Sequence, residues 1–339
     1  MSVSAQLAAY LGRTFGEPVA VENLERIAGG ASRETFRFDA VTASGRRGLI
    51  LRRDPVAQSL IETDRETEFR AYETAWQAGL PVPEPIALEP GGAELGQPFF
   101  LMDQVQGGTA VSPFDPAPFG AHAAAFGEAM FRTLGRLAAL DPTDTPLGRL
   151  HSAPGPDQCW AVALDHWAAV VAREEDEPQP TVRAAIRRLR AHPPPPAAAV
   201  RIVHGDYRSG NLLHDGAGRL LAVLDWEMAH LGDPLEDLGW AFDPLWDHGM
   251  PGHACGTVPL AQAIVWWEEE SGLRVDERAL AWWSLFNAVK GCAIWFGSAR
   301  AYRLGGCTDP VLGIAGWYTL RRHDVILSAA LERFAEQMA

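Results

Sequence analysis

The sequence has few cysteines, fewer basic than acidic side chains, and no long apolar run. Its four cysteines (Cys159, Cys255, Cys292 and Cys307) form no CxxC pair. That pattern disfavours a disulfide scaffold or a cysteine-bound metal and indicates free thiols in a reducing cytoplasm. With 29 basic and 43 acidic residues the net charge is −14, so the basic surface of a general nucleic-acid binder is missing. No run of about eighteen apolar residues predicts a transmembrane helix.

The N-terminal segment, residues 1–18, lacks a basic start followed by a long apolar stretch. We therefore expect a short amphipathic helix here rather than a signal peptide. Hydrophobic residues make up 47% of the chain and charged residues 21%, which is ordinary for a folded soluble protein. A chain of 339 residues is too long for one compact core, so two lobes or domains are predicted.

The character of the chain changes near residues 104–108. Before this point, residues 21–53 and 97–105 have the short apolar runs and glycine turns of β-strands, and residues 59–78 have helical spacing. After it, the sequence is mainly helical. We predict an α+β protein with one domain at 1–104, which contains an antiparallel sheet and a helix, and a larger helical domain at 105–339.

Within the second domain, two alanine-rich segments, 118–139 and 158–191, are predicted to be helical, and a run of prolines ends the second one. Short apolar strands are expected at 200–204 and 219–225. Everything after residue 234 has the pattern of helices. Both strands border or lie within the most informative stretch of the chain, residues 203–237.

That stretch, VHGDYRSGNLLHDGAGRLLAVLDWEMAHLGDPLED (203–237), places Asp206 and Asn211 five residues apart. This is the spacing of the kinase catalytic loop, in which the aspartate takes the proton of the acceptor hydroxyl and the asparagine holds Mg²⁺. Asp225 follows the next strand and offers a second hard oxygen ligand. The stretch predicts ATP-dependent phosphoryl transfer, with Asp206 as base and Asn211 and Asp225 as metal ligands.

Other side chains of the stretch are candidates for further roles. Arg208 is a candidate catalytic residue, because its guanidinium lies two residues beyond the base and can bind the migrating phosphoryl group. We expect His204 to pack or hydrogen-bond the loop, since no His or Cys cluster accompanies it. Glu227 is a candidate either for the surroundings of the metal or for contact with the acceptor.

The order HGDYRSGN, LDWE and LGDPLEDLGW resembles the aminoglycoside/choline phosphotransferase family. It is most similar to a subgroup that resembles the kinase domain of acyl-CoA dehydrogenase fusion proteins. The resemblance covers roughly residues 20–330 and implies a bilobal protein-kinase-like fold. It also implies ATP, with GTP as the alternative, together with Mg²⁺ and a small-molecule hydroxyl acceptor. Neither a nucleic-acid partner nor a membrane is implied.

The resemblance also implies roles in the N-terminal lobe. The phosphate-covering hairpin would be AGGASRETF (28–36), in which Gly29, Gly30 and Ser32 let the backbone approach the phosphates. Arg52 would stand on the third strand where kinases keep the phosphate-binding lysine, although its geometry differs from that of lysine. Arg53 is the competing residue, and its alternate face favours a solvated position.

A helix glutamate would pair with Arg52. Glu68 is the first choice and Glu66 the alternative. The segment FLMDQV (100–105) would link the lobes. There, Met102 would either form a wall of the adenine pocket or belong to the core, and the backbone of Asp103 and Val105 would hydrogen-bond the adenine edge.

The lower part of the catalytic loop and the acceptor side have further candidates. Asp237 resembles the buried aspartate that holds the catalytic loop from below. Twelve tryptophans, several of them within 260–300, favour a bulky or partly apolar acceptor pocket. Lys290 and Arg300 are candidates to receive an anionic acceptor, whereas the acidic run 268–270 favours a cationic one. The sequence leaves these alternatives open.

Two other functions are compatible with parts of the pattern. A nucleotide-binding regulatory protein without turnover is suggested by Arg52 in place of lysine and by the imperfect glycine loop. A metal-dependent hydrolase could use His204, Asp206 and Asp225. A protein kinase is disfavoured, because the chain from Asp225 to Asp237 leaves no room for a long activation loop.

Overall fold

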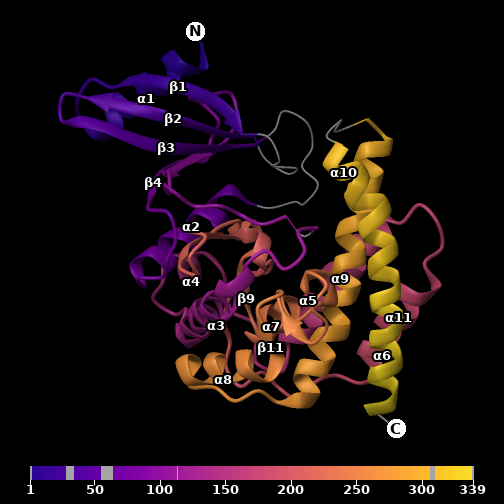
Figure 1. Cartoon of the computed structure of the whole chain (residues 1–339). Helices are drawn as coiled ribbons and strands as arrows, with labels where there is room; N and C mark the ends of the chain where they lie inside the picture. The colour runs from indigo at the N-terminus through magenta and orange to yellow at the C-terminus, as the bar shows by residue number, and fades with distance from the viewer. Residues whose placement is uncertain (1, 28–33, 55–63, 113, 306–309, 338–339) are drawn as a thin grey trace.

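The computed structural model describes residues 2–27, 34–54, 64–112, 114–305 and 310–337. A small lobe with a β-sheet lies above a larger helical lobe, and the long helices α9 and α11 run side by side along one edge of the molecule (Figure 1). This is the bilobal α+β architecture that the sequence predicts.

The sheet of the small lobe has five antiparallel strands in the order β1-β2-β3-β5-β4. β1, β2, β3 and β5 lie largely within residues 21–53 and 97–105, which the sequence marks as β-structure, whereas β4 falls outside both segments. Two helices accompany them. The bounds are α1 Val3–Phe15, β1 Ala20–Ile27, β2 Glu34–Thr42, β3 Gly45–Arg53, α2 Arg65–Gln77, β4 Pro85–Glu89 and β5 Phe99–Asp103.

The two helices cover opposite faces of this sheet. Successive side chains of a strand point to opposite faces. Phe99 of β5 therefore contacts Tyr10 of α1, with ring centroids 5.1 Å apart. Its neighbour Phe100 contacts Phe69 of α2, with centroids 5.8 Å apart. The N-terminal helix predicted from residues 1–18 is thus present, and its apolar face is buried against the sheet.

Helix α2 also packs into the core of the helical lobe. Its residues Phe69 and Tyr72 belong to the same buried cluster as the helical lobe, whereas α1 belongs to a separate cluster on the outer face of the sheet. The Thr74 hydroxyl accepts a hydrogen bond from the backbone N–H of Leu147 at 3.0 Å. The Thr67 hydroxyl lies 2.8 Å from Nε2 of His151. These contacts fix α2 to the lower lobe.

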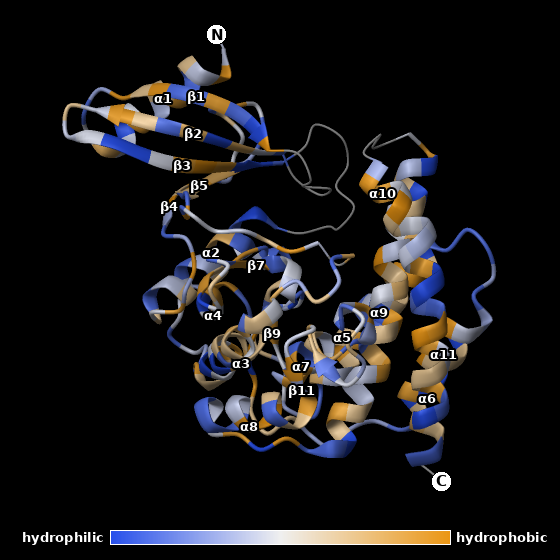
Figure 2. Ribbon diagram, viewed as in Figure 1, coloured by the Kyte–Doolittle hydropathy of each residue, from blue (hydrophilic) through white to orange (hydrophobic). Residues whose placement is uncertain are grey.

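The larger lobe is mainly helical, with two short strand pairs that hold the central stretch of the sequence. Figure 2 shows hydrophobic segments gathered along α9, the helix against which α5, α7 and α11 pack. The helices are α3 Ala123–Ala139, α4 Pro146–Leu150, α5 Cys159–Glu174, α6 Pro180–Ala191, α7 Leu235–Ala241, α8 Leu260–Ser271, α9 Glu277–Arg303, α10 Pro310–Ile314 and α11 Leu320–Gln337. A π-helical turn, Ala315–Thr319, joins the last two. The strands that hold the central stretch are β6 Arg201–Val203 with β9 His230–Gly232, and β7 Leu212–His214 with β8 Leu220–Val223. A third pair, β10 His253–Ala254 with β11 Val258–Pro259, interrupts the region after residue 234 that the sequence predicts to be entirely helical.

One predicted helical segment is divided. Residues 158–191 form two helices, α5 and α6, because the chain leaves the helix at Glu175 and Pro180 starts a new one. Proline is favoured in the first turn of a helix and disfavoured inside it. The cysteines within the described residues, Cys159, Cys255 and Cys292, are buried free thiols. Among the described helices, none has the length and hydrophobicity needed to cross a membrane.

Candidate active site

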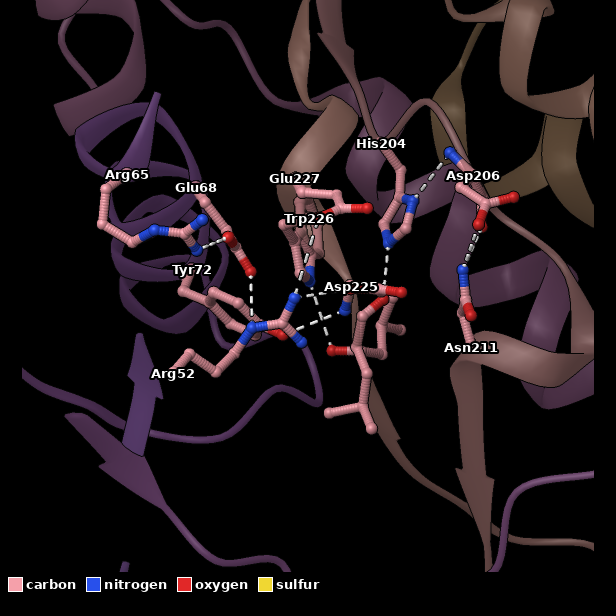
Figure 3. Close-up of polar contacts among 12 residues, drawn as sticks. Arg52, Arg65, Glu68, Tyr72, His204, Asp206, Asn211, Asp225, Trp226 and Glu227 are labelled. Atoms are coloured by element: carbon pink, nitrogen blue, oxygen red, sulfur yellow. Dashed lines mark hydrogen bonds and ion pairs between the residues drawn. The ribbon is translucent and has the colours of Figure 1, made fainter. Parts of the chain in front are cut away.

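The residues singled out in the sequence come together where β3 and α2 face the catalytic loop (Figure 3). The loop between β6 and β7 carries Asp206 and Asn211, and the turn after β8 carries Asp225. Two short 3₁₀ turns, Ser209–Asn211 and Trp226–Met228, complete these segments. Residues up to 173 positions apart in the sequence thus form one site.

The backbone of the catalytic loop is fixed from below by Asp237. This buried carboxylate accepts hydrogen bonds from the N–H groups of His204, at 2.6 Å, and Gly205, at 2.8 Å. Gly205 has φ +84°, and a Cβ at this position would lie 2.5 Å from the carbonyl oxygen of Met228. Only glycine fits both the left-handed conformation and this close approach. The role predicted for Asp237 is confirmed.

His204 holds the loop through both ring nitrogens. Its Nδ1 accepts the backbone N–H of Asp206 at 3.1 Å, and its Nε2 donates to the carbonyl of Leu224 at 2.9 Å. Burial lowers the pKa of His204 to about 4, and a proton on Nδ1 would also face the N–H of Asp206. The ring is therefore neutral and structural, as expected. The hydrolase interpretation is wrong in this respect, since no ring nitrogen remains for a metal.

The depressed pKa of His204 predicts a pH-dependent contribution to stability. Below its ordinary pKa near 6.5 the unfolded chain binds a proton that the folded protein does not, so the contribution falls between pH 6.5 and 4. A difference of about 2.5 units corresponds to roughly 3 kcal/mol. The unfolding free energies of the unchanged protein and a His204→Asn variant should therefore converge as the pH falls. Urea unfolding at pH 7, 6, 5 and 4.5 measures this.

The comparison with the variant is needed because other buried groups titrate in the opposite sense. Burial raises the pKa of Asp233 and Asp237 to about 6, so their protonation in the folded protein adds stability as the pH falls. These terms are common to both proteins and cancel in the difference. A difference in unfolding free energy that stays constant from pH 7 to pH 4.5 would contradict the prediction.

The carboxylate of Asp206 accepts three N–H groups. Nε1 of Trp240 lies 2.7 Å from Oδ1, Nδ2 of Asn211 lies 2.6 Å from Oδ2, and Nε of Arg208 lies 3.2 Å from Oδ1. The Asp206 side chain is 17% exposed, which leaves it within reach of a hydroxyl group. The two predicted catalytic residues, Asp206 and Arg208, are thus in direct contact. Arg208 also lies over the ring of Trp246, 4.8 Å from its centroid.

The two predicted metal ligands have the oxygen atoms that Mg²⁺ requires. Nδ2 of Asn211 donates to both the backbone carbonyl and the carboxylate of Asp206, so its Oδ1 points away from that residue, as Figure 3 shows. Asp225 has φ 68° and ψ 56°, a left-handed conformation that aspartate tolerates better than most residues. Its backbone N–H donates to the hydroxyl of Tyr72 at 3.0 Å. A neutral amide oxygen and a carboxylate fit a hard divalent cation.

Arg52 connects the small lobe to Asp225. Its Nε lies 2.9 Å from Oε1 of Glu68, and its NH2 group lies 2.7 Å from Oδ1 of Asp225 (Figure 3). The predicted pair with Glu68 is confirmed, whereas the alternative, Glu66, pairs with Arg70 at the surface. Burial by itself would raise the pKa of the Asp225 carboxyl, but Arg52 outweighs it and holds that pKa below its ordinary value.

Arg53, the next residue of the strand, differs from expectation, whereas Glu227 lies near the predicted metal ligand Asp225. Arg53, expected to be solvated, is only 14% exposed and pairs with Glu34 at 2.5 Å across the β2–β3 ladder. Glu227 lies 4.0 Å from the NH2 group of Arg52 and is largely buried, which places it on the side of Asp225 rather than at the surface. Glu68 itself is contacted by a second buried arginine, Arg65, one turn earlier on α2.

The segment that links the lobes agrees only in part with the role predicted for it. Met102 is buried in β5 opposite Ile50 of β3. The backbone N–H of Asp103 donates to the carbonyl of Glu84 at 2.9 Å, so that N–H is not available to an adenine. Val105 follows the end of the strand and is partly exposed. Gly29, Gly30 and Ser32, predicted to cover the phosphates, lie outside the described residues.

Comparison with known proteins decides the family. A model of the phosphotransferase enzyme family (APH) matches residues 23–258, which is more than half of the chain. The chain belongs to this family. A putative aminoglycoside phosphotransferase of Ralstonia eutropha superposes with a TM-score of 0.73 at 23% identity, covering 97% of this chain and 98% of the other.

Two further relatives fit the same assignment. A mutant of the aminoglycoside phosphotransferase APH(4)-Ia, in ternary complex with ADP and hygromycin B, has a TM-score of 0.60 at 21% identity and covers 95% of this chain and 98% of its own. Acyl-CoA dehydrogenase family member 11 of Gallus gallus is 27% identical over 228 residues, 66% of this chain and 28% of that protein. The chain therefore spans less than a third of this curated relative. The kinase-like fold and the predicted subgroup are confirmed.

Two cations predicted to receive an anionic acceptor are engaged elsewhere. Lys290 is 1% exposed, and its Nζ donates to Gly205 O at 2.5 Å and pairs with Glu236 at 2.8 Å. Arg300 pairs with Glu174 at 3.3 Å. Lys290 is therefore part of the support of the catalytic loop, and its assignment as a receptor for an anionic acceptor is wrong.

The tryptophans of residues 260–300 also differ from the prediction. Trp267, Trp282 and Trp283 are each about 1% exposed and pack in the core. Trp266 and Trp295 are partly buried and pack against the same core, so most of these tryptophans are core residues rather than the lining of a pocket. The acidic run 268–270 is likewise occupied, since Glu268 pairs with Arg274 and Glu270 with Arg132.

Sequence reasoning missed several residues of the site. Arg65 could have been found, because residues three apart on a helix are neighbours and Arg65 stands three before Glu68. Lys290 could also have been suspected, because a single lysine within an apolar helical run must be buried and paired. Tyr72 carries no such signal, as aromatic residues at helical spacing usually belong to the core. Trp240 stands at the end of the LGDPLEDLGW stretch, but the stretch does not indicate which residue its indole contacts.

Proposed function

We propose that this member of the family is an ATP- and Mg²⁺-dependent kinase that transfers the γ-phosphoryl group to a hydroxyl of a small molecule. The observation that supports this most is the meeting of Asp206, Asn211 and Asp225 in one site with Arg52. A base, two oxygen ligands and a buried cation are the parts that phosphoryl transfer needs from a protein. The complex of APH(4)-Ia with ADP supports ATP as the donor, with GTP as the alternative.

In this proposal Asp206 accepts the proton of the acceptor hydroxyl as the oxygen attacks the γ-phosphorus. The bond between that phosphorus and the bridging oxygen of ADP breaks, and ADP leaves with the electron pair. The proton passes from Asp206 to solvent. Arg208, now 3.2 Å from Asp206, has the position and charge to stabilise the equatorial oxygens of the group in transfer.

Asn211 and Asp225 would hold Mg²⁺ through Oδ1 of the amide and the carboxylate. Bound there, the ion would neutralise charge on the β- and γ-phosphates. Arg52 would bind phosphate oxygen in place of the usual lysine, while Glu68 keeps its guanidinium oriented. Glu68 is itself completely buried and contacts both Arg52 and Arg65, so its carboxylate is firmly placed.

For the acceptor, we infer an aminoglycoside-like antibiotic or a hydroxyacyl-type metabolite. The first class is supported by the aminoglycoside hygromycin B in the complex of a structural neighbour. The second is supported by the similarity to a region of an acyl-CoA dehydrogenase family member. The two classes differ in charge, since the first is cationic and a hydroxyacyl thioester of CoA is anionic, so one screen separates them.

The test is ATP consumption in the presence of Mg²⁺ and a panel of hydroxylated compounds that includes aminoglycosides and hydroxyacyl-CoA thioesters. Mass spectrometry of the acceptor identifies the phosphorylated product. We expect one class to stimulate ATP turnover and to gain one phosphoryl group. Thermal stabilisation by Mg-ATP without any phosphorylated product would instead favour the alternative function, a regulatory protein that binds nucleotide without turnover. That alternative is suggested by Arg52 in place of lysine.

A lysine at position 52 is expected to weaken nucleotide binding. Arg52 reaches both Glu68 and Asp225 through different nitrogens, and the single ammonium of lysine cannot span both. Loss of one charge-assisted hydrogen bond corresponds to about a tenfold higher KM for Mg-ATP, with kcat changed by less than about threefold. Steady-state kinetics of Arg52→Lys measures both.

The matched control is Arg53→Lys. Arg53 is the next residue of the strand, faces the other side and pairs with Glu34. Its KM for Mg-ATP should stay within about twofold of the unchanged protein. Equal rises in both variants would show that the effect arises from a general disturbance of β3 rather than from Arg52.

A further inference from the structure

The catalytic aspartate is held by the last residue of the LGDPLEDLGW stretch, to which the sequence pattern assigns no role. Trp240 lies on α7, 34 positions after Asp206, and its indole N–H donates to Oδ1 of Asp206 at 2.7 Å. The ring is 1% exposed. An indole nitrogen can only donate, so the carboxylate of Asp206 is the acceptor in this contact.

The three side chains that donate N–H groups to Asp206 differ in their other interactions during the proposed reaction. In the proposed reaction Arg208 turns to the phosphoryl group and Asn211 turns its amide oxygen to the metal. Trp240 has no second acceptor among the described residues. It is also neutral, so it orients the carboxylate without placing a positive charge beside it, which would lower its basicity.

The surroundings of Trp240 fix its ring. Trp246 packs against it with centroids 5.4 Å apart at 65°, and His323 of α11 stacks on it at 6.4 Å and 27°. Nζ of Lys290, from α9, lies 5.3 Å from the ring centroid. His323 is itself held, because its Nδ1 accepts from Trp295 and its Nε2 contacts Asp243. Four elements of the helical lobe thus determine where the indole N–H points.

We propose that Trp240 is a positioning residue, which keeps the Asp206 carboxylate aimed at the acceptor hydroxyl throughout the reaction. This rests on the proposed function of Asp206 as the base. A rigid ring is suited to the task, since a misplacement of about 1 Å at a reacting group costs about a hundredfold in rate. The contacts of His323 on α11 and Lys290 on α9 with the Trp240 ring then help to orient the Asp206 carboxylate as well as to pack the lobe.

The kinetic test is Trp240→Phe, which removes the N–H and keeps an aromatic ring. We expect kcat to fall by about tenfold to a hundredfold, with KM for Mg-ATP changed less than about twofold. A role of Trp240 in packing alone would lower kcat no more than the loss of an equally buried indole ring elsewhere in the helical lobe.

The matched control is Trp267→Phe on α8. Trp267 is equally buried, and its indole N–H has no hydrogen-bond partner among the described residues. Loss of ring volume should therefore be similar in the two variants, whereas only Trp240→Phe removes a hydrogen bond. Equal kcat values in the two variants would overturn the proposal.

A readout independent of turnover separates this proposal from the proposed function. In ¹⁵N-labelled protein the indole resonance of Trp240, assigned by its loss in Trp240→Phe, should lie downfield and move upfield in Asp206→Asn. An indole proton that is insensitive to Asp206→Asn would overturn the positioning role even in an active enzyme. If no acceptor is phosphorylated but the resonance moves, the contact stands and the proposed function fails.

Discussion

Asp206→Asn is expected to bind Mg-ATP with nearly unchanged affinity and to transfer phosphoryl about a hundred to ten thousand times more slowly, the range that a general base contributes. The amide has the shape of the carboxylate but cannot take the acceptor proton. It also turns an NH₂ group toward one of two buried donors, Trp240 or Asn211. Two quantities are measured. One is kcat with the acceptor found in the screen, and the other is the Kd of Mg-ATP, by calorimetry.

The control for this prediction is Asp165→Asn, the same chemical change at an aspartate that is 69% exposed on α5 and pairs with Arg190. Its kcat and Kd should match the unchanged protein. An Asp206→Asn protein with full kcat would show that the hydroxyl loses its proton to another group. A loss of Mg-ATP binding would show instead that Asp206 belongs to the nucleotide or metal site.

Lys290→Met is expected to lower the free energy of unfolding by about 3–5 kcal/mol, the usual effect of breaking a buried ion pair. Lys290 and Glu236 are each 1% exposed and lie 2.8 Å apart. Burial would raise the pKa of Glu236, but Lys290 and His230 outweigh it and hold that pKa at about 2. Without the lysine, the carboxylate stays buried with only His230, at 3.1 Å. Urea unfolding measures the loss.

The double variant Lys290→Met with Glu236→Gln tests the cause. If the penalty arises from an unpaired buried charge, removal of that charge should restore most of the stability. Arg274→Met is the surface control. Arg274 is 85% exposed and pairs with Glu268, and such pairs contribute less than about 1 kcal/mol. A double variant no more stable than Lys290→Met alone would assign the loss to packing or to the hydrogen bond with Gly205.

The parts of the site that could be predicted are those whose geometry is local. Asp206, Asn211, Asp225 and Asp237 lie within one stretch of 35 residues. There, two short strands and their turns translate spacing directly into position. The pair of Arg52 and Glu68 was also accessible, because the alternation of β3 selects which arginine faces α2.

The remaining parts depend on how distant helices pack. Lys290 reaches Gly205 across 85 positions of sequence, and nothing in either segment encodes that meeting. Helix α9 is apolar on most of its circumference, so its pattern marks burial but selects no face. For the same reason the tryptophans of residues 260–300 suggested an acceptor pocket where the structure has a core.

The packing of α2 determines how the chain can be divided. Residues 65–77 precede the predicted boundary at residue 104, yet Phe69 and Tyr72 are buried in the core of the helical lobe. A fragment that ended at residue 104 would contain α2 but not the helical lobe that buries its apolar side chains. Truncation or domain exchange therefore has to leave α2 with the helical lobe. The outer face of the sheet and α1 form a core of their own, whereas Ile50, Phe100 and Met102 on the inner face share a core with α2.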